Sequence, residues 1–584
     1  MAWKQITPAP MANNRRSARW FDRDDEVGFN HRVALRAEGF TPRAFENKPI
    51  IGICNSWSEL NNCNLHLRAV AEAVKRGVWA AGGFPLEFST ISLAEDLMMP
   101  TAMLYRNLMA MEVEEMIRSH PLDGVVLLCG CDKTTPAQLM GAASMDVPAI
   151  VVPGGPMLNG MWRNKPIGSG TDVWKNWDER RAGRLSQEEW HEMEGSISRS
   201  AGHCMTMGTA STMTCIAEAL GMTLPGCASI PAVDSRRYAI AEASGRRIVE
   251  MAEEVLRPSR IMTAGAFENA IRVFAALGGS TNAVIHLSAI AGRLGIPLPL
   301  SKFDELAHTT PTIANLQPSG QYLMEDFYYA GGLPAVMKEI LTLLHGEEIT
   351  VNGKTIAENL QSAQCHNPDV IRPMAQPLHA DGSLAVLYGN LAPNGAVIKR
   401  SAASNGLLQH CGRAVVFDQY EEMLQKVEDP DLDVDENCVL VLRNGGPVGG
   451  PGMPEWGQIP IPLKLLKRGV SDMVRISDSR MSGTSYGTVI LHISPEAAIG
   501  GPLAAVQNGD SIRLDVEKRR LDLLIPEDEL RRRMGAWRPP AKKYRRGYYT
   551  MFLDHILQAD KGCDFDFLVG QAGEEPYEPI VGRS

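Results

Sequence analysis

The first part of the chain alternates short apolar runs with longer segments of helical periodicity. Residues 67–82 and 104–117 carry apolar side chains at helical spacing, and residues 235–294 read as mostly helical. Four apolar runs predict buried strands, at 49–54, 84–88, 123–129 and 148–152. Apolar strands that alternate with amphipathic helices are typical of a parallel sheet covered by helices on both faces.

The pattern changes after about residue 383. Short β-rich runs follow, separated by turn residues, at 384–388, 413–417, 439–442, 488–492, 511–515 and 521–525. We therefore expect an α/β protein with two domains. Residues 1–382 would form a parallel-sheet domain with flanking helices, and residues 383–584 a β-barrel-like domain.

Composition limits the classes of partner. The 584 residues include 44% hydrophobic and 22% charged side chains, as in ordinary globular proteins. The net charge of −10 disfavours a nucleic-acid or anionic-membrane partner, and no apolar run is long enough to predict a membrane-spanning helix. The start, Met1–Pro8, lacks the apolar segment of a secretory signal, so we expect a cytoplasmic protein with reduced cysteines.

Three of the eleven cysteines stand in polar or glycine-rich surroundings. They are Cys63 between asparagines, Cys131 directly after the predicted strand 123–129, and Cys204 in Gly202–Gly208. No Cys-x-x-Cys pair occurs, which excludes a zinc ribbon or a thioredoxin-type motif. Three thiolates from three loops can hold an iron–sulfur cluster with one iron site open, but ordinary core cysteines would fit the spacing too.

Several carboxylates lie in loops where ligands gather. Asp132 adjoins Cys131, Glu95 and Asp96 follow the predicted strand 84–88, and Glu455 ends a loop rich in glycine and proline. Carboxylate oxygens suit a hard cation such as Mg²⁺, and the carboxyl ends of parallel strands are where such sheets bind ligands. For each carboxylate alone, a charged surface position is the more common explanation.

The segment 475–487 concentrates hydroxyl side chains, and Ser482 stands between Met481 and Gly483. This is not the Gly-x-Ser-x-Gly motif of hydrolases. A serine that acts as a base needs a nearby metal to stabilise its alkoxide, whereas a turn rich in capping side chains is the structural alternative. Neither a Walker motif nor a Gly-x-Gly-x-x-Gly motif after the first strand is present, which argues against phosphate binding.

Together these segments resemble one family, the dihydroxy-acid and sugar-acid dehydratases, which contain an iron–sulfur cluster and Mg²⁺. Three further stretches, 100–107, 168–174 and 327–334, resemble the sugar-acid (arabinonate/xylonate-type) branch more than the branch of branched-chain amino-acid biosynthesis. Trp456, which follows Glu455, differs from the sequence that is usual in this family. The matching stretches keep their order over nearly the whole chain: 61–64, 130–136, 153–157, 204–212, 278–282, 389–393, 449–455 and 480–484.

The resemblance implies a role for each candidate residue. Ser482 would be the base, with Thr484 beside it. The family fold also implies sites at the domain interface and a homodimer or homotetramer. The implied ligands of a 2Fe-2S cluster are Cys63, Cys131 and Cys204, and those of Mg²⁺ are Glu95, with Asp96 as the alternative, Asp132, Glu455 and Lys133, which is typically carbamylated in this family.

The resulting hypothesis is a hydro-lyase that removes water from a small-molecule sugar acid, a pentonate or hexonate. Mg²⁺ would stabilise the enolate, the Ser482 alkoxide would remove the C2 proton, and the cluster would act as Lewis acid on the C3 hydroxyl, giving a 2-keto-3-deoxy acid. The first alternative is the same chemistry on the dihydroxy acids of branched-chain amino-acid biosynthesis. More distant alternatives are a nucleotide-binding oxidoreductase and a non-catalytic binding protein.

Overall fold

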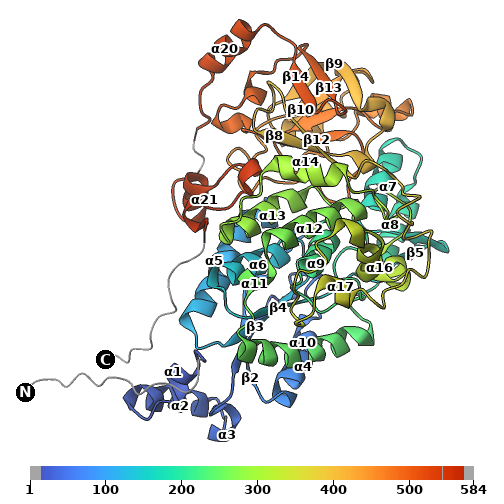
Figure 1. Cartoon of the computed structure of the whole chain (residues 1–584). Helices are drawn as coiled ribbons and strands as arrows, with labels where there is room; N and C mark the ends of the chain where they lie inside the picture. The colour runs from blue at the N-terminus through green and yellow to red at the C-terminus, as the bar shows by residue number, and fades with distance from the viewer. Residues whose placement is uncertain (1–14, 542–543, 571–584) are drawn as a thin grey trace, which may run out of the picture.

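The computed structural model describes residues 15–541 and 544–570. Residues 1–14, on which the expectation about a secretory signal rests, lie outside this part of the chain. The polypeptide forms a helix-rich α/β region that is followed by a β-barrel region (Figure 1). The proposed domain boundary at 382/383 falls between α17 (Ile356–Asn359) and β7 (Leu384–Leu387).

A four-stranded parallel sheet forms the centre of the α/β region. Its strands lie in the order β2 (Phe84–Ser89), β1 (Ile50–Asn55), β3 (Gly124–Cys129) and β4 (Ala149–Pro153). Strands β1, β3 and β4 are buried along their whole length. This burial is why they read in the sequence as continuous apolar runs, and the predicted parallel sheet is confirmed.

Helices cover both faces of this sheet (Figure 1). On one face α4 (Leu67–Ala80) packs along α10 (Ser235–Glu254), and on the other lie α5 (Arg106–Ser119) and α6 (Thr134–Met145). Every residue of α6 is buried, because a further helical layer packs on it. That layer includes α9 (Thr209–Ala219), α12 (Ala264–Leu277), α13 (Asn282–Arg293) and α14 (Leu300–His308).

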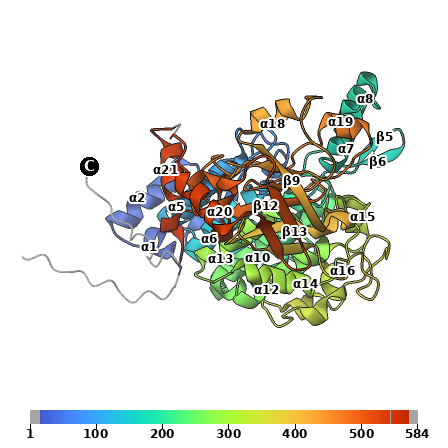
Figure 2. The same cartoon turned by 90° about the horizontal axis from the view of Figure 1, so that it is seen from above.

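Smaller elements surround this centre. A hairpin of β5 (Gly160–Trp162) and β6 (Lys165–Ile167) leads into α7 (Thr171–Arg181) and α8 (Gln187–Ile197), which project at one edge of the molecule (Figure 2). The remaining helices of this region are α1 (Ala18–Phe21), α2 (Glu26–Ala37), α3 (Pro42–Phe45), α11 (Pro258–Ile261), α15 (Met324–Tyr329) and α16 (Gly332–Glu339).

The second region is an eight-stranded mixed sheet that curls into a nearly closed barrel. Alternate side chains, such as Val439 and Val441 on β10, point into an apolar core. Backbone hydrogen bonds join Tyr388, after β7, to Arg519 and Leu521 beside and within β14, so the two edge strands meet. The order is β14 (Arg520–Leu523), β13 (Ser511–Asp515), β9 (Gln409–Phe417), β10 (Val439–Leu442), β11 (Arg475–Ser477), β12 (Val489–Ser494), β8 (Gly395–Lys399) and β7.

The expected β-barrel-like domain is confirmed, and it contains two strands that the sequence did not predict. Strands β9 to β12 are parallel, and helices α18 (Tyr420–Lys426) and α19 (Leu463–Lys467) lie in the connections between them. The sequence patterns missed β8 and β11. Strand β11 has only three residues, and it lies inside the hydroxyl-rich segment 475–487 that reads as a turn.

The end of the chain returns from the barrel to the α/β region. After α20 (Glu527–Ala536), helix α21 (Tyr548–His555) lies against α5, and the Tyr548 hydroxyl donates to the Leu104 carbonyl at 2.7 Å (Figure 1). Asp564 forms a bidentate pair with the fully buried Arg293 at 2.6 and 3.1 Å. The final described segment is thus fixed by a buried ion pair.

We predict that Asp564→Ala destabilises the protein by about 3–5 kcal/mol, because it leaves Arg293 buried with part of its charge unpaired. Asp566→Ala is the matched control, since Asp566 is 54% exposed and pairs only with His555. That change should cost less than about 1 kcal/mol. Urea unfolding of both variants measures the difference, and equal losses would contradict the assignment.

Candidate functional site

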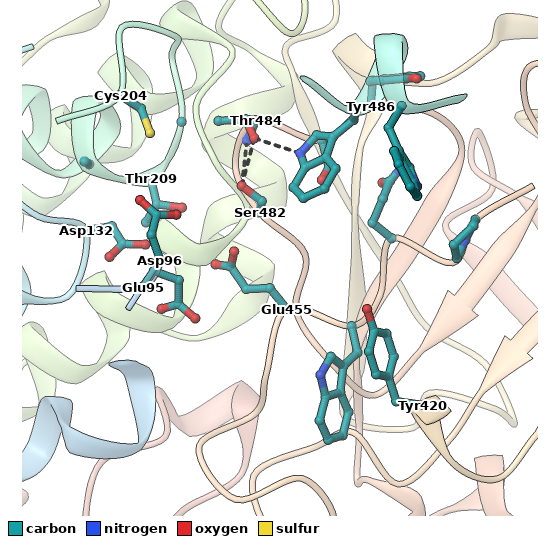
Figure 3. Close-up of a pocket in the computed structure, with 18 of the residues that line it drawn as sticks. Glu95, Asp96, Asp132, Cys204, Thr209, Tyr420, Glu455, Ser482, Thr484 and Tyr486 are labelled. Carbon is teal, nitrogen blue, oxygen red and sulfur yellow. Dashed lines mark hydrogen bonds between the residues drawn. The ribbon is translucent and has the colours of Figure 1, made fainter. Parts of the chain in front are cut away.

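A cavity of about 500 Å³ lies between loops that follow parallel strands of the two sheets (Figure 3). The α/β region contributes loops that follow β1, β2 and β3, and the barrel contributes loops that follow β10 and β11. Parallel strands collect ligand-binding loops at their carboxyl ends. The cavity therefore lies between the strand ends of the α/β sheet and those of the barrel, and both contribute loops to it.

Three carboxylates and one lysine form the polar centre of the cavity. Carboxylate oxygens of Glu95, Asp132 and Glu455 all lie within 4.8 Å of one another. The Lys133 Nζ atom is 2.5 Å from Asp132 Oδ2, 3.0 Å from Glu95 Oε2 and 3.4 Å from Glu455 Oε1. Lys133 is fully buried, and its charge joins carboxylates from both regions.

Electrostatics around Lys133 follow from this burial. Desolvation works against the Lys133 ammonium, but Asp132 and Glu95 raise its pKa above the usual value. Desolvation also works against the Asp132 carboxylate, yet Lys133 holds its pKa below the usual range. For Glu455, burial dominates and raises the pKa. Burial therefore outweighs the attraction of Lys133 and Arg480 at Glu455, whereas Lys133 outweighs burial at Asp132.

The carboxylate cluster fits a divalent cation. Glu95 Oε2 is buried and receives no well-aligned hydrogen bond, although Lys133 lies 3.0 Å away. The other oxygen, Oε1, accepts from the Thr101 hydroxyl at 2.6 Å. An unsatisfied oxygen that faces two further carboxylates is what a hard cation with oxygen ligands requires. Asp96 lines the same cavity but is not part of this triplet.

The three cysteines also converge on this cavity. The adjacent Cys131 thiol, together with burial and the charge of Cys204, raises the pKa of Cys63 well above its usual value. Burial, Asp96 and Cys131 raise the pKa of Cys204 to about 12. Cys63 and Cys131 are close enough for their thiols to interact directly, and Cys204 lines the same cavity. A soft-metal centre fits this donor set, because metal binding removes the proton that burial otherwise retains.

Glycine brings two of these cysteine loops together. A Cβ atom at Gly130 would lie 2.7 Å from the Cys63 carbonyl oxygen. The turn after β3 is completed by Thr134, whose Oγ1 accepts from the Cys131 amide at 3.0 Å and donates to the Cys131 carbonyl at 3.0 Å. A glycine here is what allows the loop after β1 to pack on the loop after β3.

Glu455 is held from both regions. Its Oε1 atom accepts from Asn282 Nδ2 and from the buried Arg480 guanidinium, each at 2.9 Å. Arg480 also donates to Thr101 Oγ1 at 3.1 Å. One guanidinium therefore connects the Glu95 and Glu455 sides of the cluster, and it supplies positive charge in addition to Lys133.

Two buried carboxylates shape the loop that leads to Glu455. Asp478 accepts from the Gly445 amide at 2.8 Å, and Glu496 accepts from the amides of Val448 and Gly449 at 2.9 and 2.8 Å. Burial raises the pKa of Asp478 to about 6 and that of Glu496 to about 7. These residues position the loop 443–455 without lining the cavity.

Ser482 lies opposite the carboxylates and takes part in a short hydrogen-bonded chain (Figure 3). Its Oγ atom is 2.9 Å from Thr484 Oγ1 and accepts from the Thr484 amide at 3.3 Å. The Trp174 indole N–H donates to Thr484 Oγ1 at 3.3 Å. Because an indole only donates, the Thr484 hydroxyl is free to donate to Ser482.

The loop of Ser482 depends on close packing against the α/β region. A Cβ atom at Gly483 would lie 2.6 Å from the Thr209 amide nitrogen, and one at Gly170 would lie 2.2 Å from Thr484 Oγ1. The Thr171 hydroxyl donates to the Thr484 carbonyl at 2.7 Å. Both glycines therefore let the barrel loop touch α7 and α9.

Lys399 lies behind this loop and was not anticipated from the sequence. It is 1% exposed, and its Nζ lies 3.5 Å from the Gly483 carbonyl oxygen. Burial alone lowers the pKa of Lys399 to about 7. No sequence signal marked this residue, because an isolated lysine at the end of a short strand reads as a surface charge.

The far wall of the cavity is aromatic. Trp456 stacks on Tyr420 with ring centroids 5.0 Å apart and an interplanar angle of 11°. Trp174, Trp177 and Tyr486 line the same side. The cavity thus has one side with carboxylates and thiols and another side with aromatic rings.

The structure brings together every candidate residue from the sequence around one cavity. Cys63, Cys131, Cys204, Glu95, Asp132, Glu455, Ser482 and Thr484 line it, and Lys133 lies buried within the carboxylate cluster. Sequence reasoning gave no role to Thr101, Asn282 or Arg480. All three stand in stretches that resemble the family, 100–107, 278–282 and 480–484, and the sequence contains no other indication of their role.

Comparisons with known proteins match this arrangement over almost the whole chain. The family model for the N-terminal part of dihydroxy-acid/6-phosphogluconate dehydratases matches residues 48–359, and the model for the C-terminal part matches residues 369–563. Together they span the loops that line both sides of the cavity.

Individual relatives are also similar over their full length. The chain is 56% identical to L-arabonate dehydratase of Azospirillum brasilense, over 96% of this chain and 98% of that protein. It is 55% identical to L-arabinonate dehydratase of Rhizobium leguminosarum (96% and 97%) and 51% identical to 6-deoxy-6-sulfo-D-gluconate dehydratase of Pseudomonas putida (97% and 98%). Relatives named dihydroxy-acid dehydratase are 40% to 43% identical.

The fold, the two-sided site and these matches define an enzyme of the hydro-lyase class, a dehydratase. The chain belongs to the dihydroxy-acid/6-phosphogluconate dehydratase family, as its resemblance indicated. The relatives that are 56% and 55% identical are named for a sugar acid, which is consistent with the sugar-acid branch. Within residues 15–541 and 544–570, no helix combines the length and apolar character needed to cross a bilayer.

We predict that Lys399→Met stabilises the protein near pH 7 and that this gain shrinks as the pH rises. The unfolded lysine has a pKa of 10.5 and the folded one about 7, so the unfolded state binds more protons between these values. Wild-type stability should therefore rise relative to the variant by up to about 1.4 kcal/mol per pH unit. Urea unfolding at about pH 7 and about pH 9 measures this, and a constant difference would contradict it.

Proposed function

We propose that the protein dehydrates a sugar acid, a pentonate or hexonate, to a 2-keto-3-deoxy sugar acid. The observation that carries this proposal is the position of Ser482 across one cavity from three clustered carboxylates and three converging cysteines. The names of the relatives that share 51% to 56% of its residues support a sugar acid as substrate.

In this proposal Glu95, Asp132 and Glu455 hold Mg²⁺, with Lys133, if carbamylated, as a further ligand. Cys63, Cys131 and Cys204 hold a 2Fe-2S cluster. When bound, these groups supply charge stabilisation for an enolate-like carboxylate and a Lewis acid for the departing C3 hydroxyl. Arg480 and Asn282 keep Glu455 oriented toward the other two carboxylates.

Ser482 acts as the base on the C2 proton. Two hydrogen bonds directed at its Oγ atom, from the Thr484 amide and the Thr484 hydroxyl, favour the alkoxide form. Trp174 supports this direction, because its indole N–H occupies one lone pair of Thr484 Oγ1 and leaves the Thr484 hydroxyl hydrogen to donate to Ser482. Thr484 therefore orients the serine rather than removing a proton itself.

In this mechanism Ser482 both removes the proton and returns it. The Ser482 alkoxide takes the C2 proton, the C2–H electron pair forms the C2–C3 double bond, and the C3–O bond breaks. The serine hydroxyl returns its proton to the leaving hydroxide, so that water departs and the alkoxide is restored. The enol product then tautomerises to the 2-keto-3-deoxy acid without help from a further residue.

The alternative substrates, dihydroxy acids of branched-chain amino-acid biosynthesis, use the same groups. Two observations favour sugar acids: the lower identity to dihydroxy-acid dehydratases, and a far wall that carries Asp178, Gln458 and Tyr486 among its aromatic side chains. An apolar substrate tail would leave the buried Gln458 Oε1 atom without a hydrogen-bond partner. Assembly as a homodimer or homotetramer and a cytoplasmic location stay predictions.

We predict that the wild-type enzyme, purified without oxygen, converts at least one aldonate in a panel of pentonates and hexonates faster than dihydroxyisovalerate. Ser482→Ala should lower kcat by at least about 100-fold, because general-base catalysis contributes that much. Ser471→Ala is the control, since this exposed serine lines the same cavity outside the proposed chain. Near-normal turnover by Ser482→Ala would remove the serine from the mechanism.

We predict that Cys63→Ser, Cys131→Ser and Cys204→Ser each lose the visible absorbance and the iron content of a 2Fe-2S cluster, because each removes one of three sulfur ligands. Cys411→Ser should retain both, since Cys411 is exposed on β9 outside the cavity. Iron analysis and absorbance spectra of anaerobically purified variants measure this. A variant with an unchanged spectrum would show that its cysteine is not a ligand.

A further inference from the structure

One face of α7 forms part of the cavity wall. Trp174, Trp177 and Asp178 all line the cavity, and their spacing of three and four residues places them on the same side of the helix. The next residue, Glu179, does not line the cavity; it forms an ion pair with Arg184 at 2.6 Å. Only one acidic residue of this helical turn therefore faces the substrate space.

The start of α7 is fixed to the Ser482 loop, which gives the helix a known direction along the cavity. Thr171 donates to the Thr484 carbonyl at 2.7 Å, and Trp174 donates to the Thr484 hydroxyl oxygen at 3.3 Å. Asp178 follows Trp174 by four residues, about 6 Å further along the helix axis. Its carboxylate thus belongs to the end of the cavity away from the reacting carbons.

Charges at that end are already paired within the protein. Arg475 is the one cationic side chain among the described residues that line the cavity, and it pairs with Asp472 at 2.7 Å. Arg181 neutralises Asp178 in part, at 3.0 Å, but also pairs with Glu428 at 2.7 Å. Lys175 is exposed and lies over the Tyr486 ring, 5.5 Å from its centroid.

The polar groups at this end suit hydroxyls better than an anion. Gln458 Oε1 and Arg475 Nε are buried without a hydrogen-bond partner, so one can accept from and the other donate to a sugar hydroxyl. The stacked rings of Trp456 and Tyr420 provide flat apolar surface for the C–H groups of a polyhydroxy chain. A terminal phosphate or sulfonate would meet the Asp178 carboxylate, and the cation that lines the cavity, Arg475, already pairs with Asp472.

We propose that Asp178 is a specificity-determining residue that restricts this enzyme to sugar acids with an uncharged, hydroxyl-bearing far end. This inference rests on the proposed function, because it concerns the far end of the same substrate. Like charges brought together in a partly buried site are strongly disfavoured. Overall identity does not decide the point, since the relative that is 51% identical is named for a substrate with a terminal sulfonate.

The test compares matched substrates. The aldonate that wild-type holoenzyme converts fastest is assayed beside the same aldonate with a phosphate on its last carbon, and D-gluconate beside 6-deoxy-6-sulfo-D-gluconate. We expect kcat/KM to be at least about 100-fold lower for each charged analogue, the size of effect that a like-charge contact produces. Equal use of the charged and uncharged compounds would overturn the inference. Failure to convert any aldonate would instead overturn the proposed function.

Asp178→Asn isolates the charge, because asparagine keeps the shape and loses the negative charge. In this variant the ratio of kcat/KM for the uncharged substrate to kcat/KM for the charged analogue should fall by at least about tenfold. The main cause should be a lower KM for the charged analogue. Glu179→Gln removes a charge from the adjacent position outside the cavity and should leave the preference unchanged. An unchanged preference in Asp178→Asn, or an equal change in Glu179→Gln, would show that Asp178 is not the determinant.

Discussion

Three partly buried carboxylates within 4.8 Å of one another are the constraint on which the rest of this structure depends. Such a group repels itself strongly unless cations stand between its members. Lys133 and Arg480 meet this need, and each contacts acidic or hydroxyl groups from both the α/β region and the barrel. The electrostatics of the site and the cohesion of the two regions therefore rest on the same side chains.

Close backbone approach is the second requirement of the site. Loops from both sheets reach one cavity because glycine removes the Cβ atom at the crossing points, as Gly130 does beside Cys63 and Gly483 does beside Thr209. Asp478 and Glu496 add order to the loop that carries Glu455. Precision at the cavity thus comes from packed backbone and buried hydrogen bonds, not from long flexible side chains.

Much of this architecture was predictable from the sequence. The runs 123–129 and 148–152 match β3 and β4 within a residue at each end, because a strand buried on both faces must be apolar throughout. Strand β11 escaped detection since three residues show no period. Family-like stretches identified the cavity residues, whereas the choice between Glu95 and Asp96 needed the geometry of a loop. Lys399 and Asp178 act through contacts with residues far away in the sequence, which no local pattern encodes.

The ion pair between Arg293 and Asp564 has a consequence for biosynthesis. The two residues are 271 positions apart, so the ribosome completes the α/β region and most of the barrel before the arginine meets this partner. Until then a guanidinium destined for the interior has only Glu114 and Ser144 to compensate it. The ion pair that fixes this segment can therefore form only after the ribosome has synthesised nearly all of both regions.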